Sequence, residues 1–224
     1  MKTLAFESST TRGTVALFQD RRLIEHLEFP NGQRTARSFA PVFDQLLTRH
    51  LASPAEIDLV ALTAGPGSFT GLRIAVTAAK ALAFATESQI VALNTLDVLV
   101  HQLPSGVTQA CAVMDAQRQQ FFAAYYQRVE DSDWTVTQPC HIVDQRQLLE
   151  QLPADVMLTG PGLLKVPDQL QSKLLIAARD VWAPQAVTVG QLAWGRHVDG
   201  HYDDLWSLKP EYYRPSYAQE KRRT

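Results

Sequence analysis

The 224-residue chain has few cysteines and no excess of charge of one sign. Cys111 and Cys140 are too few for a disulfide framework and match no common zinc spacing, so we expect two reduced, partly buried thiols. The 21 basic and 23 acidic side chains leave no overall electrostatic footprint for nucleic acid. The single basic cluster is Lys221, Arg222 and Arg223 in the tail, and no direct nucleic-acid site is evident.

Long apolar runs are also missing. No segment reaches the roughly 18 uninterrupted apolar residues that a membrane span needs. The opening "MKTLAFESS" has no apolar core of the length found in signal peptides. We therefore expect a cytoplasmic protein with no membrane partner.

Hydrophobic periodicity predicts an α/β order in the first hundred residues. An amphipathic helix is expected from the apolar residues Phe39, Val42, Phe43, Leu46, Leu47 and Leu51, with Ser38 as its N-cap and Pro41 in its first turn. Strands are expected at residues 3–8, 14–19, 23–29, 57–63 and 89–93, and further helices at residues 70–85 and 95–102. The resulting order is βββαβαβα.

The second half begins to repeat this order. The Pro-Ser-Gly cluster at residues 104–106 marks a boundary between residues 1–103 and 104–224. Strands are expected at residues 108–115, 120–128, 134–142 and 156–159, with helices at residues 144–151 and 186–198. We predict two lobes, the second partly degenerate, with the segment from about residue 186 to residue 224 packing back on the first lobe.

The segment "LTAGPGSFTGLRIAVTAAKALAFA" (residues 62–85) allows two interpretations. A loop with Gly65, Gly67, Ser68 and Thr70 before a helix permits phosphate binding at the helix N-terminus. However, the segment lacks the lysine of a P-loop, and Pro66 removes one N–H donor. A tight turn that presents the helix is the other interpretation.

The helix after this loop is rich in alanine, and its only charged residues, Arg73 and Lys80, share one face. Small side chains allow either burial under a sheet or close approach of another helix. Arg73 in the first turn is disfavoured by the helix dipole, so we expect an acidic partner, with Asp44 a candidate.

The pair His197 and His201 has the i,i+4 spacing of a metal site. Gly200 between them is typical of a helix end, which favours a helix C-terminus with His197 near the dipole. Cys111 lies in an apolar strand without a nearby base, which favours a structural thiol.

Five segments together resemble the TsaB family, formerly YeaZ. They are "LAFESSTTRGTVALF", "TAGPGSFTGLRIAVTAAKALAF", "VALNTLDVLV", "AVMDAQRQQFFAAYYQ" and "LKPEYYR", in family order across nearly the whole chain. "GPGSFTGLR" is the specific part. The sequence departs from the family pattern where Gln117 stands at the usual arginine and Gln119 and Gln120 at the usual Gly-Glu.

The resemblance implies an actin-like (ASKHA, ribonuclease H-like) fold. It also implies a non-catalytic paralogue of TsaD, from the glycoprotease-like M22 group, that supports TsaD in forming N6-threonylcarbamoyladenosine at position 37 of ANN-decoding tRNAs. TsaE and tRNA would be reached through TsaD. The sequence leaves open whether the free chain is a monomer or, when TsaD is absent, a homodimer through the same helices. The implied contact is made by helices of the first lobe, for which we predict Phe39, Val42, Phe43, Leu46, Arg73, Val76, Thr77 and Lys80.

No catalytic residue, cofactor or metal is expected. Thr95 and Leu99 stand where TsaD-like chains carry their metal-binding histidines, and leucine offers a metal no lone pair. The alternative is a stand-alone ATP-binding phosphotransferase or glycoprotease-like metallohydrolase. It requires Glu7, Asp115 and the loops at residues 65–71 and 160–162 to surround ATP. In that alternative Glu7 lies near the phosphates of ATP; in the local interpretation its carboxylate bonds to the backbone of the "SSTTRG" turn. Likewise, the local interpretation of Asp115 is a strand end with an Asp turn.

Overall fold

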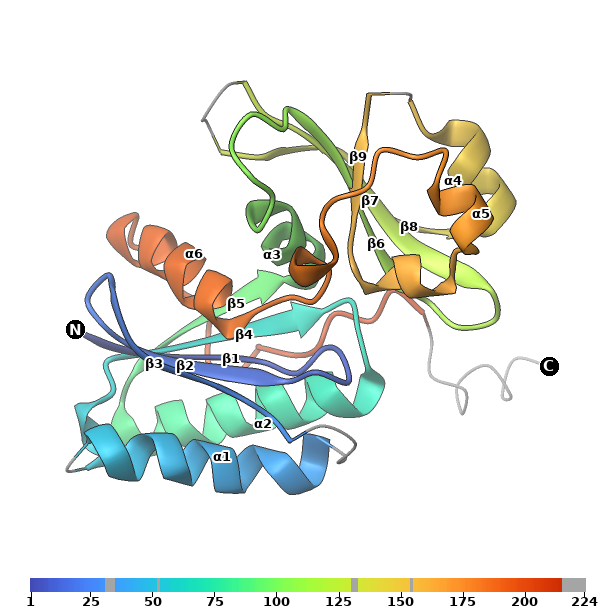
Figure 1. The fold of residues 1–224 in the computed structure, drawn as a ribbon. Coiled ribbons are helices and arrows are strands. Elements are labelled where there is room, and N and C mark those ends of the chain that lie inside the picture. The colour runs from blue at the N-terminus through green and yellow to red at the C-terminus, as the bar shows by residue number, and fades with distance from the viewer. Residues whose placement is uncertain (31–34, 52, 130–132, 154, 215–224) are drawn as a thin grey trace.

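The computed structural model describes residues 1–30, 35–51, 53–129, 133–153 and 155–214. Two mixed sheets, each opened by a three-stranded antiparallel meander, form the two lobes (Figure 1). The strands of the first lobe are β1 (Lys2–Glu7), β2 (Thr14–Gln19), β3 (Arg22–Glu28), β4 (Leu59–Gly65) and β5 (Gln89–Asn94). Those of the second lobe are β6 (Gln109–Asp115), β7 (Gln120–Gln127), β8 (Thr135–Asp144) and β9 (Met157–Thr159).

Strand order relates the two sheets. The first runs β3-β2-β1-β4-β5 and the second β8-β7-β6-β9. The first strand of each meander pairs in parallel with the strand that follows the next helix, β1 with β4 and β6 with β9. Among the described residues the counterpart of β5 in the second sheet is reduced to a single parallel bridge, Leu158 with Ile176, so the predicted repeat with a reduced second copy agrees with the observed topology.

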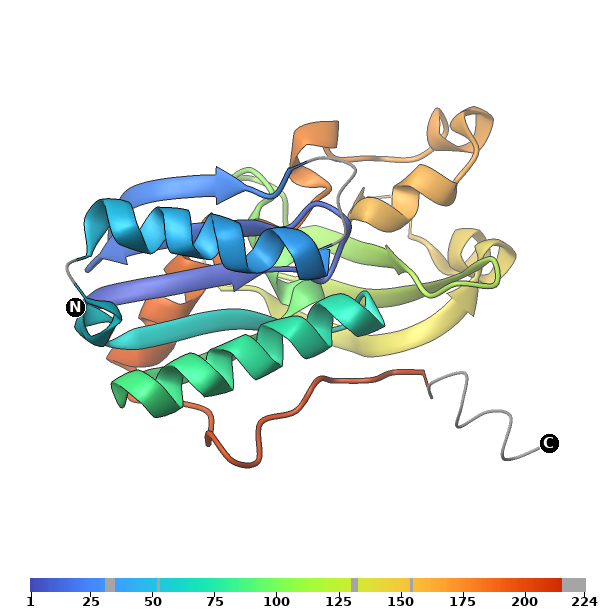
Figure 2. The ribbon, with the colours of Figure 1, turned by 90° about the horizontal axis from the view of Figure 1, so that it is seen from below.

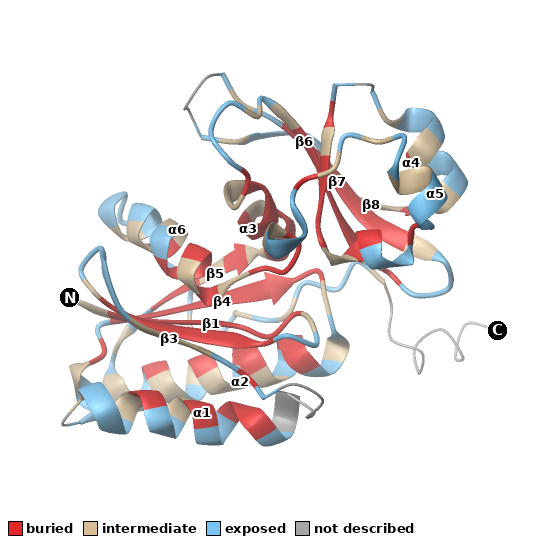
Figure 3. Cartoon of the chain, in the orientation of Figure 1, coloured by how far each residue is buried: buried red, intermediate tan, exposed pale blue. Residues whose placement is uncertain are grey.

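Helices cover both faces of the first sheet. The helices α1 (Thr35–His50) and α2 (Phe69–Thr86) lie on one face, and α6 (Ala186–Val198) lies on the other (Figures 1 and 3). This arrangement buries all seven residues of β4, as its continuous apolar run predicts. Ala186, Val189 and Ala193 of α6 pack against the sheet, because small side chains let the helix approach closely.

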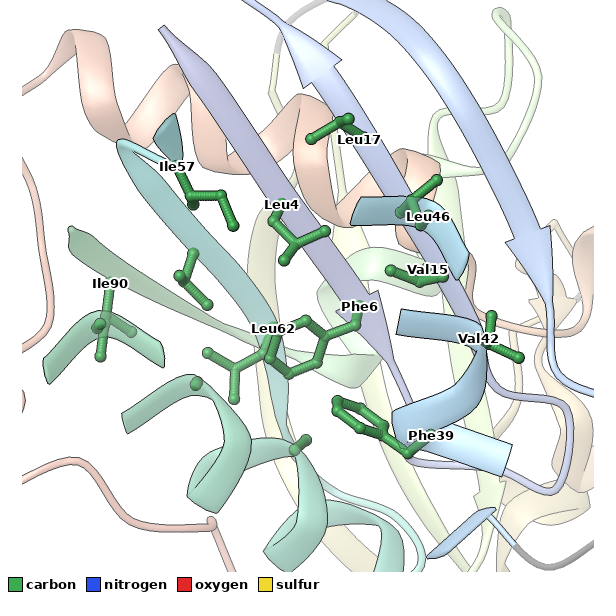
Figure 4. Close-up of a cluster of buried hydrophobic side chains, with 14 of the residues drawn as sticks. Leu4, Phe6, Val15, Leu17, Phe39, Val42, Leu46, Ile57, Leu62 and Ile90 are labelled. Atoms are coloured by element: carbon green, nitrogen blue, oxygen red, sulfur yellow. The ribbon is translucent and has the colours of Figure 1, made fainter. Parts of the chain in front are cut away.

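The core of the first lobe lies between the sheet and the inner faces of α1 and α2 (Figure 4). Phe39, Val42 and Leu46, one turn apart on α1, point at β1 and β2, and Phe39 meets Phe6 edge-on with ring centroids 5.3 Å apart. Burial of each such side chain contributes about 1.5–3 kcal/mol. The periodicity that predicts the helix therefore also predicts its inward face.

The start of α1 differs from the prediction. The helix begins at Thr35, so Ser38 lies inside it with a buried side chain and is not its N-cap. Pro41 consequently lies in the helix interior and not in its first turn. The short helix α5 (Asp168–Gln171) and the 3₁₀ turns at Pro54–Glu56, Pro161–Lys165 and Arg179–Val181 were not predicted. The other helices, α3 (Thr95–His101) and α4 (Gln145–Gln151), lie where they were expected.

Helix α3 joins the two lobes. Its Leu96, Leu99 and Val100 belong to the apolar core of the second lobe, whereas Val98 packs in the first. Asp97 accepts a 2.8 Å hydrogen bond from the hydroxyl of Tyr126 on β7. The boundary at residues 103 and 104 remains a prediction about folding units, since α3 contributes to both cores.

The last described residues form an extended segment that we call the C-terminal strap, residues 203–214. Figure 2 shows it running beside α2, on the flank away from α1, towards the second lobe. Asp203 holds the outer edge of β5: its N–H donates to the carbonyl of Ile90, and its carboxylate accepts from the N–H of Ala92 at 2.7 Å. The basic cluster at Lys221, Arg222 and Arg223 lies outside the described residues.

Within the described residues, α2 alone is long and apolar enough to cross a membrane by length and composition. Only 33% of its most apolar stretch is buried. Its inner residues, including Leu72, Ala75, Ala79 and Ala83, pack under the sheet. The outer face of an apolar helix is thus left at the surface.

Candidate functional site

The glycine loop before α2 is packed against the turn after β1. Ser68 caps α2, because its hydroxyl accepts from the Gly71 N–H, and its own N–H donates to the carbonyl of Ser9 at 2.6 Å. A Cβ added to Gly71 would lie 1.9 Å from the Ser8 carbonyl oxygen, and one added to Gly67 would lie 2.5 Å from Ser9. These glycines permit close backbone contact, which accounts for the motif without an anion.

Gly65 has a different neighbour. A Cβ there would lie 2.5 Å from the carbonyl oxygen of Glu211 in the strap, and the Glu211 N–H donates to Ala64. Thr70 is exposed in the first turn of α2. The structure therefore does not gather Gly65, Gly67, Ser68 and Thr70 around one open cradle; the strap covers one end of the loop and the β1–β2 turn covers the other.

Glu7 is fully buried at the end of β1. Its Oε1 accepts from the N–H of Ser9 at 2.6 Å and from the hydroxyl of Thr63 at 3.0 Å, whereas Oε2 has no partner among the described residues. Burial raises the pKa of this carboxyl to about 7, against the opposing effect of the hydrogen bonds from Ser9 and Thr63. The Glu7 carboxyl thus connects the turn after β1 to β4 by hydrogen bonds, which is the local role considered for it from the sequence.

Asp115 closes its own turn. Its carboxylate accepts a 2.7 Å hydrogen bond from the N–H of Gln117, which is the Asp turn of the local interpretation. Gln117, Arg118 and Gln119 all have positive φ, at 64°, 55° and 60°, which costs non-glycine residues about 1 kcal/mol or more each. The departure from the family's Gly-Glu thus coincides with an exposed left-handed turn.

A hollow of about 980 Å³ lies beside this turn, within the second lobe. The turn, one side of α4 from Gln145 to Glu150, and Lys165 line it. Three carboxylates around it already have protein donors: Asp115 has the N–H of Gln117, Asp144 has that of Gln147, and Glu150 has the Arg146 side chain. Residues 160–162 do not line this hollow, and Gly160 packs on β6 instead, where an added Cβ would lie 2.3 Å from the Val113 carbonyl oxygen.

The two positions at which TsaD-like chains carry metal-binding histidines lie in the packed interior. Thr95 and Leu99 of α3 are fully buried, and Leu99 packs in the core of the second lobe. Across the part of the chain that the structure describes, no three His, Cys, Asp or Glu side chains converge as a metal site would require. His197 lies in the last turn of α6, which ends at Val198, and Gly200 follows with φ of 70°, so the predicted helix end is confirmed.

Both cysteines are free thiols. Cys111 is buried on β6, and burial raises its pKa to about 12. Burial also raises the pKa of Cys140 to about 12, and the nearby Glu211 acts in the same direction. Neither thiol has the lowered pKa of a nucleophile.

Half of the predicted interface residues point inward. Phe39, Val42 and Leu46 of α1 and Val76 of α2 are buried, because they form the apolar faces that attach the two helices to the sheet. Phe43 is half-buried and stacks on Phe39 with ring centroids 5.5 Å apart. The four buried side chains leave little surface for a partner while the helices stay in place, and they support the helix pair. The partner contact of the predicted set stays a prediction.

Arg73, Thr77 and Lys80 lie on the outer side of α2, but the two cations hold the strap. Arg73 donates to the hydroxyl of Tyr212 at 3.0 Å, and its guanidinium lies 3.8 Å from the centre of the Phe69 ring. Lys80 donates to two strap carbonyls, those of Trp206 and Leu208. The internal candidate Asp44 is therefore wrong, because the partners of Arg73 among the described residues are the aromatic side chains Phe69 and Tyr212. An acidic partner on another protein stays a prediction.

Sequence reasoning missed the strap as part of this surface. It reaches the second lobe, where Tyr213 lies 6.1 Å from the Phe122 ring and Arg214 donates to the side chain of Gln120. Asn94, which caps α3, also donates to Glu211 and Tyr213. The Tyr-Tyr-Arg triplet in "LKPEYYR" was the available signal, since aromatic and guanidinium groups are costly to leave without partners.

Fold and site together define an actin-like, two-lobed α/β protein. The glycines of the loop before its helix α2 pack against the backbone of the protein itself. The TsaD family model, described as tRNA N6-adenosine threonylcarbamoyltransferase, matches residues 32–176. A YeaZ structure from Pseudomonas aeruginosa superposes with a TM-score of 0.76 at 23% identity, covering 94% of this chain and 100% of that one. The activator of 2-hydroxyisocaproyl-CoA dehydratase from Clostridium difficile, at a TM-score of 0.50, shares the fold alone.

Two relatives that match over nearly their whole length identify the family within this class of actin-like proteins. The tRNA threonylcarbamoyladenosine biosynthesis protein TsaB of Escherichia coli is 29% identical over 99% of this chain and 98% of its own length. The protein of the same name from Bacillus subtilis is 30% identical over 99% of this chain and 97% of its own length. The chain belongs to the TsaB (YeaZ) family.

Proposed function

We propose that the chain is a non-catalytic subunit of the cytoplasmic machinery that makes N6-threonylcarbamoyladenosine at position 37 of ANN-decoding tRNAs. It binds a TsaD-type threonylcarbamoyltransferase and supports its activity, and TsaE and tRNA are reached through that partner. The names of the full-length relatives support the pathway. The observation that supports a binding role in this chain is the outer face of α2, which is apolar yet exposed.

The outer face of α2 is suited to close contact with another protein. Its exposed positions are Arg73, which contacts Phe69 and the strap, and small side chains apart from one aromatic, including Thr70, Thr77, Ala81 and Phe84. The neighbouring outer face of α1 carries Asp44 among other polar residues. A flat, small-residue helix face allows close backbone approach of a partner helix, and its apolar area stabilises the contact when water is removed.

The non-catalytic part of the proposal is supported by the chemistry of the described residues. Leu99 has no lone pair for a metal, and Thr95 is enclosed in the packing of α3. The N–H of Ser68 and the hydroxyl of Ser8, which a phosphate loop would offer to a nucleotide, bond instead to Ser9 and Gly71. The Glu7 carboxyl is fully enclosed, and its Oε1 is already engaged by the N–H of Ser9 and the hydroxyl of Thr63.

The test is reconstitution with the TsaD of the same organism. Modified nucleoside in the tRNA is quantified by mass spectrometry with and without this chain, and complex formation is measured by size-exclusion chromatography. Ala81→Arg should abolish the complex and the stimulation, because it places a long cation on the apolar face. Lys173→Glu in the second lobe is the matched surface control. Full TsaD activity without this chain, or tight Mg-ATP binding by this chain that Glu7→Ala removes, would overturn the proposal.

A further inference from the structure

Two aromatic side chains stand exposed together at the end of α2. Phe84 in the last turn of α2 is 66% exposed, and Trp206 in the strap is 73% exposed. Their rings meet edge to face with centroids 5.9 Å apart. We call this pair the aromatic corner. Large aromatic side chains left in water at one spot are typical of the residues that carry most of the energy of a protein interface.

The fold holds Trp206 in this outward position. The Asp204 carboxylate accepts from the N–H of Ser207 at 2.8 Å, and the Leu208 N–H donates to the Asp204 carbonyl, which closes a tight turn. On either side of Trp206, Leu205 and Leu208 pack against the core of the first lobe. A partner would therefore meet a tryptophan whose backbone is already ordered, so little conformational entropy is lost on binding.

Lys80 reinforces the turn from the helix. Its ammonium donates to the carbonyls of Trp206 at 3.0 Å and of Leu208 at 3.1 Å. The cation is thus directed at the strap, as is the guanidinium of Arg73 further along the helix. Both cations keep their charge but are directed at the strap, and the aromatic corner with the neighbouring Thr77 and Ala81 carries no charged side chain of its own. This uncharged area suits an apolar protein face better than a phosphate backbone or an anionic membrane.

We infer that the aromatic corner is the anchor of the surface that binds a TsaD-type chain, and that Lys80 is a positioning residue that holds Trp206 for this contact. The inference rests on the proposed function and adds the strap to the partner surface. The corner is continuous with the outer face of α2. The TsaD family model matches the part of this chain that contains α1 and α2, so a TsaD-type partner has the counterpart of this helix pair to offer. A second copy of this chain is the competing occupant.

The test is a titration of the full-length chain with the TsaD of the same organism by calorimetry. Trp206→Ala and Phe84→Ala should each weaken the complex at least about tenfold. Tyr202→Ala is the matched control, because Tyr202 is an exposed aromatic residue just before the strap, bonded to His197 of α6. It should bind within twofold of the unchanged chain. Thermal melts of each variant verify that the fold is kept.

Lys80→Met tests the positioning role. It should weaken binding in the unchanged chain but have no further effect in a Trp206→Ala background, since the lysine acts through the tryptophan. Equal losses in both backgrounds would refute positioning. A TsaD complex of undiminished affinity with Trp206→Ala and Phe84→Ala would overturn the inference and leave the proposed function standing. Loss of self-association without loss of TsaD binding would assign the corner to a second copy. No complex with the unchanged chain would overturn both proposals.

Discussion

The turn after β1 and the turn after β6 occupy equivalent places in the two lobes, and each begins with a carboxylate at the end of a strand. In the first lobe Glu7, Ser8 and Ser9 are buried under the glycine loop. In the second lobe residues 117–119 are exposed and left-handed. The same topology therefore supports a buried turn in one lobe and an exposed, strained turn in the other. We call the buried turn, with the glycine loop packed on it, the closed joint. The difference arises from close packing by glycine, not from strand order.

The closed joint should be the more sensitive of the two to added volume. Gly71→Ala places a Cβ 1.9 Å from a backbone oxygen and should destabilise the protein by about 3 kcal/mol or more. Gly162→Ala in the second lobe, where the nearest atom is at 2.9 Å, should cost about 1–2 kcal/mol. Urea unfolding followed by circular dichroism measures both.

Gly195→Ala is the control for these glycine variants. An added Cβ there meets nothing within 4 Å, so helix propensity alone should raise the stability by up to about 1 kcal/mol. A Gly71→Ala protein as stable as Gly162→Ala would show that the joint can relax.

The second prediction concerns the pH dependence of stability. Burial raises the pKa of Glu7 from 4.5 to about 7, so the protonated carboxyl stabilises the fold below about pH 4.5, and this contribution is lost as the pH rises through 7. The total is about 3 kcal/mol. Glu7→Gln should remove this slope, so the stability of the variant relative to the unchanged chain should increase between pH 5 and pH 8.

This prediction is tested by the unfolding free energies of Glu7→Gln and of the unchanged chain at those two pH values. Asp115→Asn changes the equivalent carboxylate and should leave the slope in place. A Glu7→Gln protein with the slope of the unchanged chain would mean that Glu7 stays ionised in the fold.

The smallest expected effect is relief of the strained turn. Arg118→Gly should stabilise the protein by about 0.5–1 kcal/mol, because glycine adopts a φ of 55° without steric cost. Arg118→Ala is the matched control: it removes the same guanidinium but keeps a Cβ, so it should not stabilise. Melting temperatures by calorimetry separate the two, and equal shifts would assign the effect to the side chain.

Most of the fold could be predicted, because the elements have strong local signals. The period-3.6 pattern of α1 and the continuous apolar run of β4 depend on neighbouring residues alone. The interface residues were harder to predict for the same reason. Phe39, Val42 and Leu46 define the helix by being apolar, and in the structure that apolar stripe packs on the sheet. The contact surface that we propose therefore uses exposed side chains, several of them small or polar, which hydrophobic periodicity does not single out.

The strap offered only the Tyr-Tyr-Arg triplet as a local signal, and that triplet does not say where the segment packs. It has no helical or strand period, and hydrogen bonds to residues far away in the sequence, such as those from Lys80 and Asn94, hold it in place. The Tyr212 partner of Arg73 was missed for this reason, since it lies 139 residues away in the sequence, whereas the Phe69 ring lies one turn before Arg73 on the same helix. The N-cap of α1 was misplaced because Ser38, a residue type that favours caps, is instead buried inside the helix.

The hydrogen bonds that Asp203 makes with Ile90 and Ala92 at the edge of β5 have a consequence for solubility. β5 is the last strand of its sheet, and an uncovered strand edge offers unpaired N–H and C=O groups to any extended chain. Asp203 covers that edge at its middle. A chain cut before Asp203 would expose the edge together with the apolar flank of α2, so it should aggregate by strand addition even with every helix and strand of the two lobes intact.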